Sequence, residues 1–367
     1  MKSNKYEILT NRQIALIILS TIVGYGILIL PKNAVENAGT AAWVAVALAT
    51  IYAALVTYMF TYLGYMHPNM TMPDYSQKLV GKFFTFVFVL IYVLQHFVLF
   101  ILLVKNTGQH ISQTVLVKTP TPVIIFVFIL VAFYAVSKNL RVVALVCEFY
   151  GVTITIGLVI ICILLFSQGN INNMRPFLGT YDIKTYFKAS LTLSIPFLGM
   201  ETLFAVPIDK KNGKKVFKYT TIAILFIGFL YILIVESCIS VRGTDMIIHY
   251  KDALIEVVRS VDVVQLEFLR RLDGLFIIIW IMAVFTTVIM YFYSTVFLLS
   301  KCFTKISYKA IAIAIMIIAS FCASFIPLDP PDIEKALNYT SYFSTVTIVL
   351  IPLILIIFTR VKKHEKK

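Results

Sequence analysis

Long apolar runs recur along the whole chain and constrain its fold more than any other feature. A helix needs about 20 consecutive apolar residues to cross a hydrocarbon layer about 30 Å thick. About ten runs of that kind alternate with short segments that hold most of the charged residues. With 60% hydrophobic and 14% charged residues, the chain leaves no stretch for a water-soluble domain. The sequence therefore predicts an all-α polytopic membrane protein, with residues 1–367 forming a single transmembrane domain.

The ranges of about ten transmembrane helices follow from these runs. The predicted spans are Gln13–Leu30, Trp43–Met66, Phe83–Val104, Val123–Val136, Val142–Phe166, Ala189–Val206, Thr220–Val241, Leu275–Ser300, Ala310–Ile326 and Tyr342–Thr359. The fourth run is short, so a re-entrant segment or a buried core helix is the alternative there. One span fewer would place the two termini on opposite sides of the membrane.

The net charge of +14 is distributed unevenly between the two sides of the predicted bundle. If the N-terminus is inside, the inner segments hold about 20 of the 32 Lys and Arg residues. In the long outer stretch before the eighth span, acidic residues offset the basic ones. This asymmetry predicts that both termini are cytoplasmic and that the basic residues meet lipid headgroups of the bilayer. It argues against nucleic acid as a partner.

Neither the cysteines nor any short motif indicates catalysis or a cofactor. The five cysteines lie in or near spans without paired spacing: Cys147, Cys162, Cys238, Cys302 and Cys322. The chain contains no His-Glu-x-x-His motif and no Gly-x-Ser-x-Gly motif. We therefore expect no metal site, no cofactor and no enzymatic activity. A purely structural scaffold is a further alternative.

The first span contains a cluster that interrupts a helix. Gly24, Tyr25 and Gly26 follow one another near its middle, and Pro31 comes seven residues after Gly24. Because the bilayer core offers no water to freed backbone groups, such a break is tolerated where the backbone lines a cavity or packs on protein. A Gly-x-Gly pair taken alone is more often a close-packing contact between helices than a binding loop.

The sixth span contains a second interruption. Its sequence holds Pro196, Phe197, Leu198, Gly199 and Glu201 within six residues. Two breaks at the first and sixth of ten spans occupy matching positions if the chain consists of two five-helix repeats. The repeats would cover about residues 10–166 and 185–360. Because five is odd, the second repeat would be inverted in the membrane, as in many secondary carriers.

This 5+5 inverted repeat, with broken helices 1 and 6, predicts a solute site near the membrane midplane. The amino ends of half-helices suit a carboxylate, while freed carbonyl groups suit an ammonium group or a cation. An amino acid carries both charged groups. Among common small solutes it therefore fits this arrangement best.

Glu201 is the most informative ionisable residue because it lies near mid-span, beside a helix break. A charge at that depth costs several kcal/mol unless it is paired, so a functional role is the default hypothesis. The alternative role is structural, in which its carboxylate caps the chain after the break.

Other polar residues of the middle region complete the predicted site. In the third span, Gln95 and His96 precede Leu99, and His96 either lines the cavity, titrates with a coupled proton or is a satisfied core histidine. In the eighth span, Thr286 and Thr287 can ligate a cation or the solute. Their alternative is hydrogen bonding to a carbonyl of their own helix.

An amphipathic stretch lies in the outer segment 242–273. Its apolar residues recur with roughly helical spacing between charged ones, which indicates a helix at the membrane surface. It either covers the solute path, docks a partner or lies passively at the interface.

Several strings resemble one family, the B subunits of bacterial spore germinant receptors. These endospore germination permeases belong to the amino acid–polyamine–organocation transporter superfamily. The string LTNRQIALIILSTIVGYGILILPKNAVENAGTAAW (Leu9–Trp43) is similar to the opening of that family. The string RLDGLFIIIW (Arg271–Trp280) is similar to its signature at the start of span 8, and PFLGME (Pro196–Glu201) resembles its span-6 motif. The resemblance covers the full length.

The resemblance implies a LeuT/APC-like fold and a nutrient-sensing subunit that acts with a larger membrane A subunit and a C lipoprotein. It implies the inner membrane of the spore as location. With the helix breaks, it gives a predicted ligand-binding set of Gly24, Tyr25, Gly26, Gln95, His96, Leu99, Phe197, Leu198, Gly199, Glu201 and Thr287. An amino-acid transporter with alternating access is the alternative function.

Overall fold

A computed structural model describes residues 9–179, 182–261 and 272–364 of the chain. The α-helices are α1 (Asn11–Gly26), α2 (Leu30–Ala38), α3 (Ala42–Met66), α4 (Met72–Thr114), α5 (Thr121–Val136), α6 (Leu140–Gln168), α7 (Ile183–Thr192), α8 (Lys215–Ile247), α9 (Ala253–Arg259), α10 (Leu272–Cys302), α11 (Tyr308–Phe325) and α12 (Pro330–His364). The short 3₁₀ turns are η1 (Gly39–Ala41), η2 (Ile171–Met174), η3 (Ile195–Phe197), η4 (Met200–Ala205) and η5 (Lys210–Asn212).

Seven helical segments within these residues are long and apolar enough to cross a membrane. Three shorter apolar segments, Asn11–Gly24, Thr121–Val136 and Ile195–Ala205, coincide with the first, fourth and sixth predicted spans. The protein is therefore an all-α, multi-pass integral membrane protein. The fourth predicted span is a 16-residue helix, α5, that packs against α4, α10 and α11.

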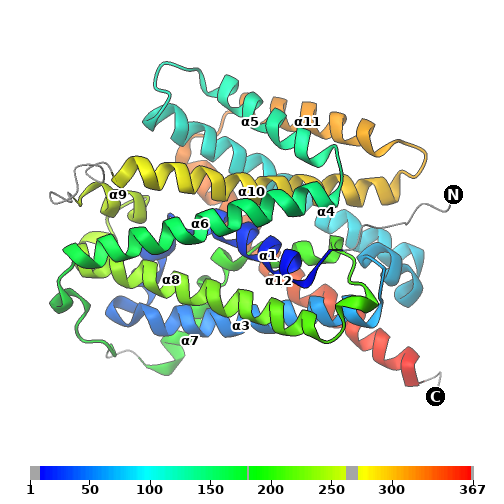
Figure 1. Ribbon diagram of the computed structural model, residues 1–367, viewed down its shortest axis with the longest axis horizontal. Helices are drawn as coiled ribbons and strands as arrows, with labels where there is room; N and C mark the ends of the chain where they lie inside the picture. The colour runs from blue at the N-terminus through cyan, green and yellow to red at the C-terminus, as the bar shows by residue number, and fades with distance from the viewer. Residues whose placement is uncertain (1–8, 180–181, 262–271, 365–367) are drawn as a thin grey trace.

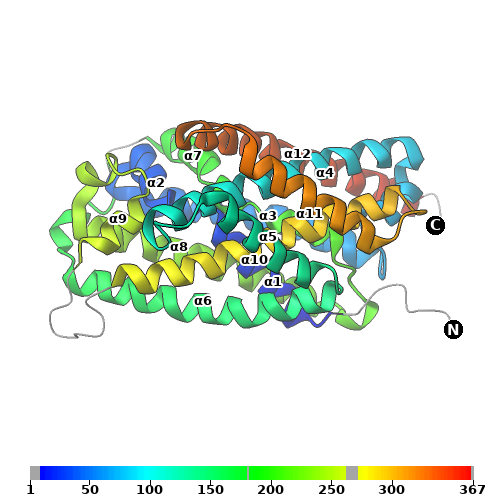
Figure 2. The same cartoon turned by 90° about the horizontal axis from the view of Figure 1, so that it is seen from above.

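The long helices lie roughly along one direction in Figure 1, with α5 and α11 on one flank and α3 and α7 on the other. In Figure 2, α6 and α12 lie on opposite sides of the bundle, with α10 between them. The start of α1 and the end of α12 lie toward the same end of the bundle, which we call the inner end. The opposite, outer end carries α9.

Helix α1 lies in the core although it is short. It contacts α6, α8 and α10, and Ile14, Ile18 and Ile22 have no exposed surface. Helix α5 instead leaves apolar side chains such as Phe126 exposed, as expected of a helix whose solvent is lipid. The centre of the bundle is therefore built around α1.

Local chemistry accounts for where the helices begin and end. Thr10 caps α1 through its side chain, which accepts a hydrogen bond from the N–H of Gln13, and Gln13 bonds back to the N–H of Thr10. Gly81 has a φ of 86° and divides α4 into a short inner piece and a long spanning piece. The outer segment 242–273 contains the end of α8 and helix α9, while its residues 262–271, and with them Arg271 of the string Arg271–Trp280, lie outside the described residues.

Candidate functional site: two helix breaks and an outer pocket

The first helix break lies slightly later in the chain than its glycines suggest. Helix α1 continues through Gly24 and ends at Gly26, and a turn over residues 27–29 leads into α2. A Cβ atom at Gly24 would lie 2.2 Å from the carbonyl oxygen of Ala283, and one at Gly26 would lie 2.7 Å from Cα of Pro196. Both glycines therefore allow close approach, Gly24 to α10 and Gly26 to η3.

The second break replaces most of the sixth span by irregular backbone. Helix α7 ends at Thr192, and the turns η3 and η4 follow, joined by Leu198 and Gly199. Gly199 has a φ of 120°, which disfavours any residue with a side chain. A continuous α-helical second half, implied by the half-helix argument, is not formed; η4 is a 3₁₀ turn.

Glu201 caps this second break. Its Oε2 accepts a hydrogen bond of 2.7 Å from the N–H of Gly199. Its Oε1 lies 3.4 Å from Nε2 of His96, and neither side chain has exposed surface. The capping role considered for Glu201 is thus present, together with a buried acid–histidine contact.

The two breaks touch each other and share a partner on α8 that the sequence analysis did not single out. The hydroxyl of Tyr231 donates to the carbonyl oxygens of Ile22 and Pro196, at 3.2 and 2.9 Å. The ring of Phe197 lies 5.1 Å from that of Tyr231. A tyrosine in the middle of an apolar span was the available signal, since a buried hydroxyl normally requires a partner.

The threonine hydroxyls of α10 are engaged by α1. Thr287 donates to the carbonyl oxygen of Thr21 at 2.7 Å, and Thr286 donates to that of Ser20 at 2.8 Å. Both also bond to the carbonyl group of Ala283 in their own helix, which is the alternative considered above. In this arrangement these hydroxyls hold α1 against α10.

The remaining predicted site residues lie in the same region. Gln95 accepts a hydrogen bond of 2.8 Å from Thr347 of α12, and Leu99 and Leu198 are fully buried in the core. The side chain of Tyr25 lies outside what the structure describes. The predicted set is therefore brought together as a packed junction of α1, α4, α10 and the turns η3 and η4.

A pocket opens at the outer end of the bundle and extends down to Gly24. The space between its lining atoms is about 650 Å³ when the opening to solvent is included, and about 50 Å³ of it is accessible to the centre of a water-sized sphere. Its lining comes from the α1–α2 turn, α4, the start of α9, α10 and α12: Gly24, Leu28, Ile29, Leu103, Asn106, Thr107, Lys251, Asp252, Trp280, Val284, Glu334, Leu337 and Asn338. Of the predicted residues whose side chains are described, Gly24 is the one that lines it.

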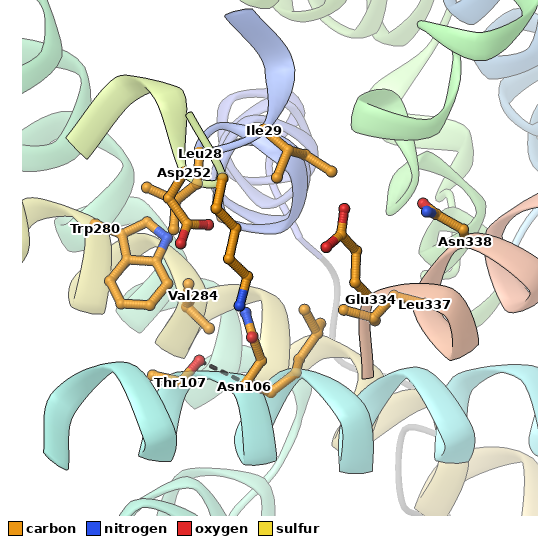
Figure 3. Close-up of a pocket in the computed structure, with 13 residues that line it drawn as sticks. Leu28, Ile29, Asn106, Thr107, Asp252, Trp280, Val284, Glu334, Leu337 and Asn338 are labelled. Atoms are coloured by element: carbon orange, nitrogen blue, oxygen red, sulfur yellow. Dashed lines mark hydrogen bonds between the residues drawn. The ribbon is translucent and has the colours of Figure 1, made fainter. Parts of the chain in front are cut away.

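The pocket combines charged groups with an apolar wall. Figure 3 shows the carboxylates of Asp252 and Glu334 facing the pocket from opposite sides, with Asn106 on α4 between them. Lys251 contributes one positive charge. The indole ring of Trp280 lines the same space, and His110 packs against it edge-on while its Nε2 lies 3.7 Å from Oδ2 of Asp252. This pattern fits a small solute with both an ammonium and a carboxylate group.

Sequence reasoning missed this pocket because its residues come from distant parts of the chain. Asn106 comes just after the third predicted span, while Asp252 and Glu334 lie in segments between predicted spans, where polar residues are ordinary. Within the described residues, no three His, Cys, Asp or Glu side chains gather as a metal site would require.

Comparison with known proteins relates the chain to one family and one fold. The profile of the family described as "Spore germination protein" matches residues 8–333. Spore germination protein A2 of Bacillus subtilis is 26% identical over 95% of this chain and 94% of its own length. Spore germination protein GerLB of Bacillus cereus is 25% identical over 100% and 98%.

Solved structures with a similar fold are transporters. MhsT in complex with L-phenylalanine superimposes with a TM-score of 0.70 at 13% identity, covering 96% of this chain and 90% of MhsT. Mhp1, a nucleobase-cation-symport-1 family transporter, gives a TM-score of 0.67 at 12% identity, covering 92% and 75%. At these identities the likeness concerns the fold alone, and it agrees with the predicted LeuT/APC-like arrangement.

Proposed function

The chain belongs to the spore germination protein family, and from this premise we propose that it is a nutrient-sensing membrane subunit whose ligand, an amino acid, binds in the outer pocket. The family and the transporter-like fold support a membrane protein for nutrient sensing or transport. The observation that carries the ligand assignment is that Lys251 and two carboxylates line the same pocket as an apolar wall. In this proposal the chain binds its ligand without catalysing a reaction.

The charges of the pocket match those of a zwitterion. Asp252 and Glu334 attract the ammonium group, and Lys251 attracts the carboxylate group. Trp280 and Val284 offer apolar surface to the ligand's side chain. A sugar or an uncharged nucleoside offers no opposite charge to any of these three groups, so the pocket disfavours them.

The position of Gly24 connects ligand binding to the helix breaks. Gly24 lines the pocket and is also where α1 packs most closely against α10. A ligand that fits the pocket better in one arrangement of α1 and α10 shifts the balance between arrangements by its difference in affinity. The predicted midplane residues, from Gly26 to Thr287, would then transmit the change rather than hold the ligand alone.

We place the protein, within this proposal, in the inner membrane of the spore with both termini in the cytoplasm. The germinant receptor A subunit and the C lipoprotein would be the partners that respond to the change. The positive-inside asymmetry of the sequence supports the orientation. The family supports the location and the partners.

A thermal-shift screen of the purified full chain against the common amino acids, with nucleosides and sugars as comparison solutes, tests the ligand class. We expect stabilisation by one or a few amino acids. Asp252→Asn should weaken binding about 10- to 100-fold, because hydrogen bonds to charged groups contribute about 1.5–3 kcal/mol.

The matched control is Glu256→Gln, which removes a carboxylate on α9 that pairs with Arg259 and does not line the pocket. It should leave affinity unchanged. Equal losses in Asp252→Asn and Glu256→Gln, or stabilisation by uncharged sugars instead, would contradict the assignment. Gly24→Trp is unsuitable for filling the pocket, since any Cβ atom there meets Ala283.

The alternative function is an amino-acid transporter with alternating access, which the fold of MhsT in complex with L-phenylalanine favours. Uptake of a labelled amino acid into proteoliposomes by this chain alone distinguishes the two. Accumulation that Asp252→Asn reduces would establish transport. Binding without uptake would support a sensing subunit.

A further inference from the structure

A second group of ionisable side chains lies at the centre of the bundle, apart from the outer pocket. His96 of α4 and Glu201 of η4 approach to 3.4 Å between Nε2 and Oε1. Among the ion pairs of the described residues, this is the one in which neither side chain has any exposed surface. Helix α4 belongs to the first repeat and η4 to the second, so the contact joins the two repeats.

The surroundings favour a carboxylate at Glu201. Its Oε2 accepts the 2.7 Å hydrogen bond from the N–H of Gly199, and a charged acceptor makes the stronger bond. An isolated carboxylate at this depth would cost several kcal/mol. A nearby positive charge offsets that cost, and His96 is the basic side chain in contact.

Three aromatic rings lie around the imidazole ring of His96. Its ring is stacked on Phe204, with centroids 5.3 Å apart and planes within 9°. The rings of Tyr291 and Tyr92 lie 5.0 and 6.0 Å away. Aromatic faces within about 6 Å attract a cation.

The other groups around the pair are neutral. Besides Tyr92, Gln95 and Phe204, these are Tyr291 of α10 and Thr347 of α12, with Tyr92 and Gln95 both bonded to Thr347. Ser294 lies about one turn beyond Tyr291 on α10 and is buried as well. No Lys or Arg of the described chain forms an ion pair with Glu201.

Several polar atoms of this group are buried without a hydrogen-bond partner in the part of the chain that the structure describes. They are both ring nitrogens of His96, Oε1 of Glu201, Nε2 of Gln95 and Oγ of Ser294. An unsatisfied buried polar group costs about 1–3 kcal/mol. A cluster retained at such a cost in the centre of a membrane protein points to a function beyond packing.

We propose that His96 and Glu201 form a proton-binding site. In the packed arrangement one proton is held on the imidazole ring as the counter-charge of the Glu201 carboxylate. When α4 and η4 move apart and water enters, the N–H bond of the imidazolium breaks, the proton passes to a water molecule and the ring becomes neutral. Loss of the proton without separation would leave a lone buried carboxylate, so proton release and separation of the repeats are linked.

Nitrogen-15 NMR of the full chain in lipid nanodiscs, with labelled histidine, tests the site without any solute. The His96 signal is assigned by its absence in His96→Gln. We expect both ring nitrogens of His96 to carry protons in the folded wild-type chain, because the Glu201 carboxylate lies beside the ring. In Glu201→Gln the ring should carry a single proton, while in the matched control Asp252→Asn, which removes the acid beside His110, the His96 signal should not change.

A His96 ring with one proton in the folded wild-type chain would overturn the proposal, as would a signal that Glu201→Gln leaves unchanged. If Glu201→Gln does not yield folded protein, the wild-type spectrum alone decides between these outcomes. Stabilisation by Na⁺ at constant pH with a neutral His96 ring would indicate a metal cation at Glu201 instead, and would also overturn it. Because no solute is present, failure here leaves the outer-pocket proposal intact.

Discussion

Helix α4 carries two histidines that each lie beside a carboxylate, and the two pairs differ in their exposure to solvent. His96 and His110 are about four turns, or roughly 21 Å, apart on the same side of the helix. His96 meets Glu201 with no exposed surface, whereas His110 meets Asp252 with 14% and 15% of the side chains exposed. The same two chemical groups therefore occupy a dry junction in one place and the wall of an open pocket in the other.

The difference shows that depth within the fold, rather than residue type, decides what such a pair can do. At the outer pair, water shares in solvating the charges, so either partner can change or bind a solute at small cost. At the central pair, each charge stabilises the other. Loss of one charge leaves the other buried and uncompensated, so the surrounding packing has to change. In the function proposed above, the outer end recognises the solute and the centre transmits the change.

The largest expected effect separates the two acids. Glu201→Ala removes the cap of Gly199 and the partner of His96, so it should lower the free energy of unfolding by about 3–5 kcal/mol. Asp252→Ala should lower it less, because part of the His110 and Asp252 side chains stays in contact with water. Unfolding of the two detergent-solubilised variants in denaturant measures both values. Equal destabilisation would mean that burial does not distinguish the pairs.

Glycines sharpen the comparison between the centre and the outer end. Gly24→Ala forces a Cβ atom against Ala283 and should cost about 1–3 kcal/mol by overpacking. Gly274→Ala, near the outer start of α10, meets nothing within 4 Å and should not destabilise. The thermal midpoints of the two variants give the comparison. A tolerated Gly24→Ala would show that α1 and α10 separate there without cost.

The hydroxyl that joins the two helix breaks should have an intermediate effect. Tyr231→Phe removes the donor to the carbonyl group of Pro196 and an additional donor to the helical carbonyl group of Ile22, and it should cost about 1–2 kcal/mol. Tyr308→Phe is the matched control, since it removes a single bond to Val136 at the inner end. Its expected cost is about 0.5–1 kcal/mol. The thermal unfolding midpoint of Tyr231→Phe should therefore lie below that of Tyr308→Phe, and the reversed order would contradict this expectation.

The smallest effect concerns a lysine that supports the outer pocket from behind. Lys105 donates to the carbonyl oxygens of Ala323 and Ile326 at the end of α11, just before α12 brings Glu334 to the pocket. Lys105→Met should weaken amino-acid binding about threefold, or about 0.6 kcal/mol, by loosening that wall. Lys105→Arg keeps the donors and should largely restore affinity. Titration calorimetry measures the amino-acid affinity of both variants. Equal losses of affinity would exclude the hydrogen bonds of Lys105 as the cause.

Much of the architecture was predictable from the sequence because lipid imposes a strict rule. Trp43–Met66 was predicted and α3 covers Ala42–Met66; Val142–Phe166 was predicted and α6 covers Leu140–Gln168. Every spanning segment must be apolar and satisfy its own backbone, so periodic runs reveal the spans. The same rule made the Gly and Pro clusters of spans 1 and 6 recognisable as breaks.

The candidate site was predictable only in part. The sequence indicated that Glu201, Gly199 and the threonines of span 8 matter, and the structure brings them to one junction. Tyr231 was missed because a single tyrosine in an apolar span carries no periodic signal. The pocket was missed because Asn106, Asp252 and Glu334 meet through contacts between helices that lie far apart in the sequence.

The sequence by itself determined that this protein lies in a lipid bilayer, where its spans and helix breaks fall, and to which family it belongs. These properties depend on composition and on neighbouring residues, which a chain displays without folding. The tertiary structure decided that Gly24 and Gly26 serve close packing, that Glu201 faces His96 in a dry centre, and that the outer charges surround a pocket. Those outcomes depend on distances between helices and on exclusion of water, and both are fixed only when the helices pack together.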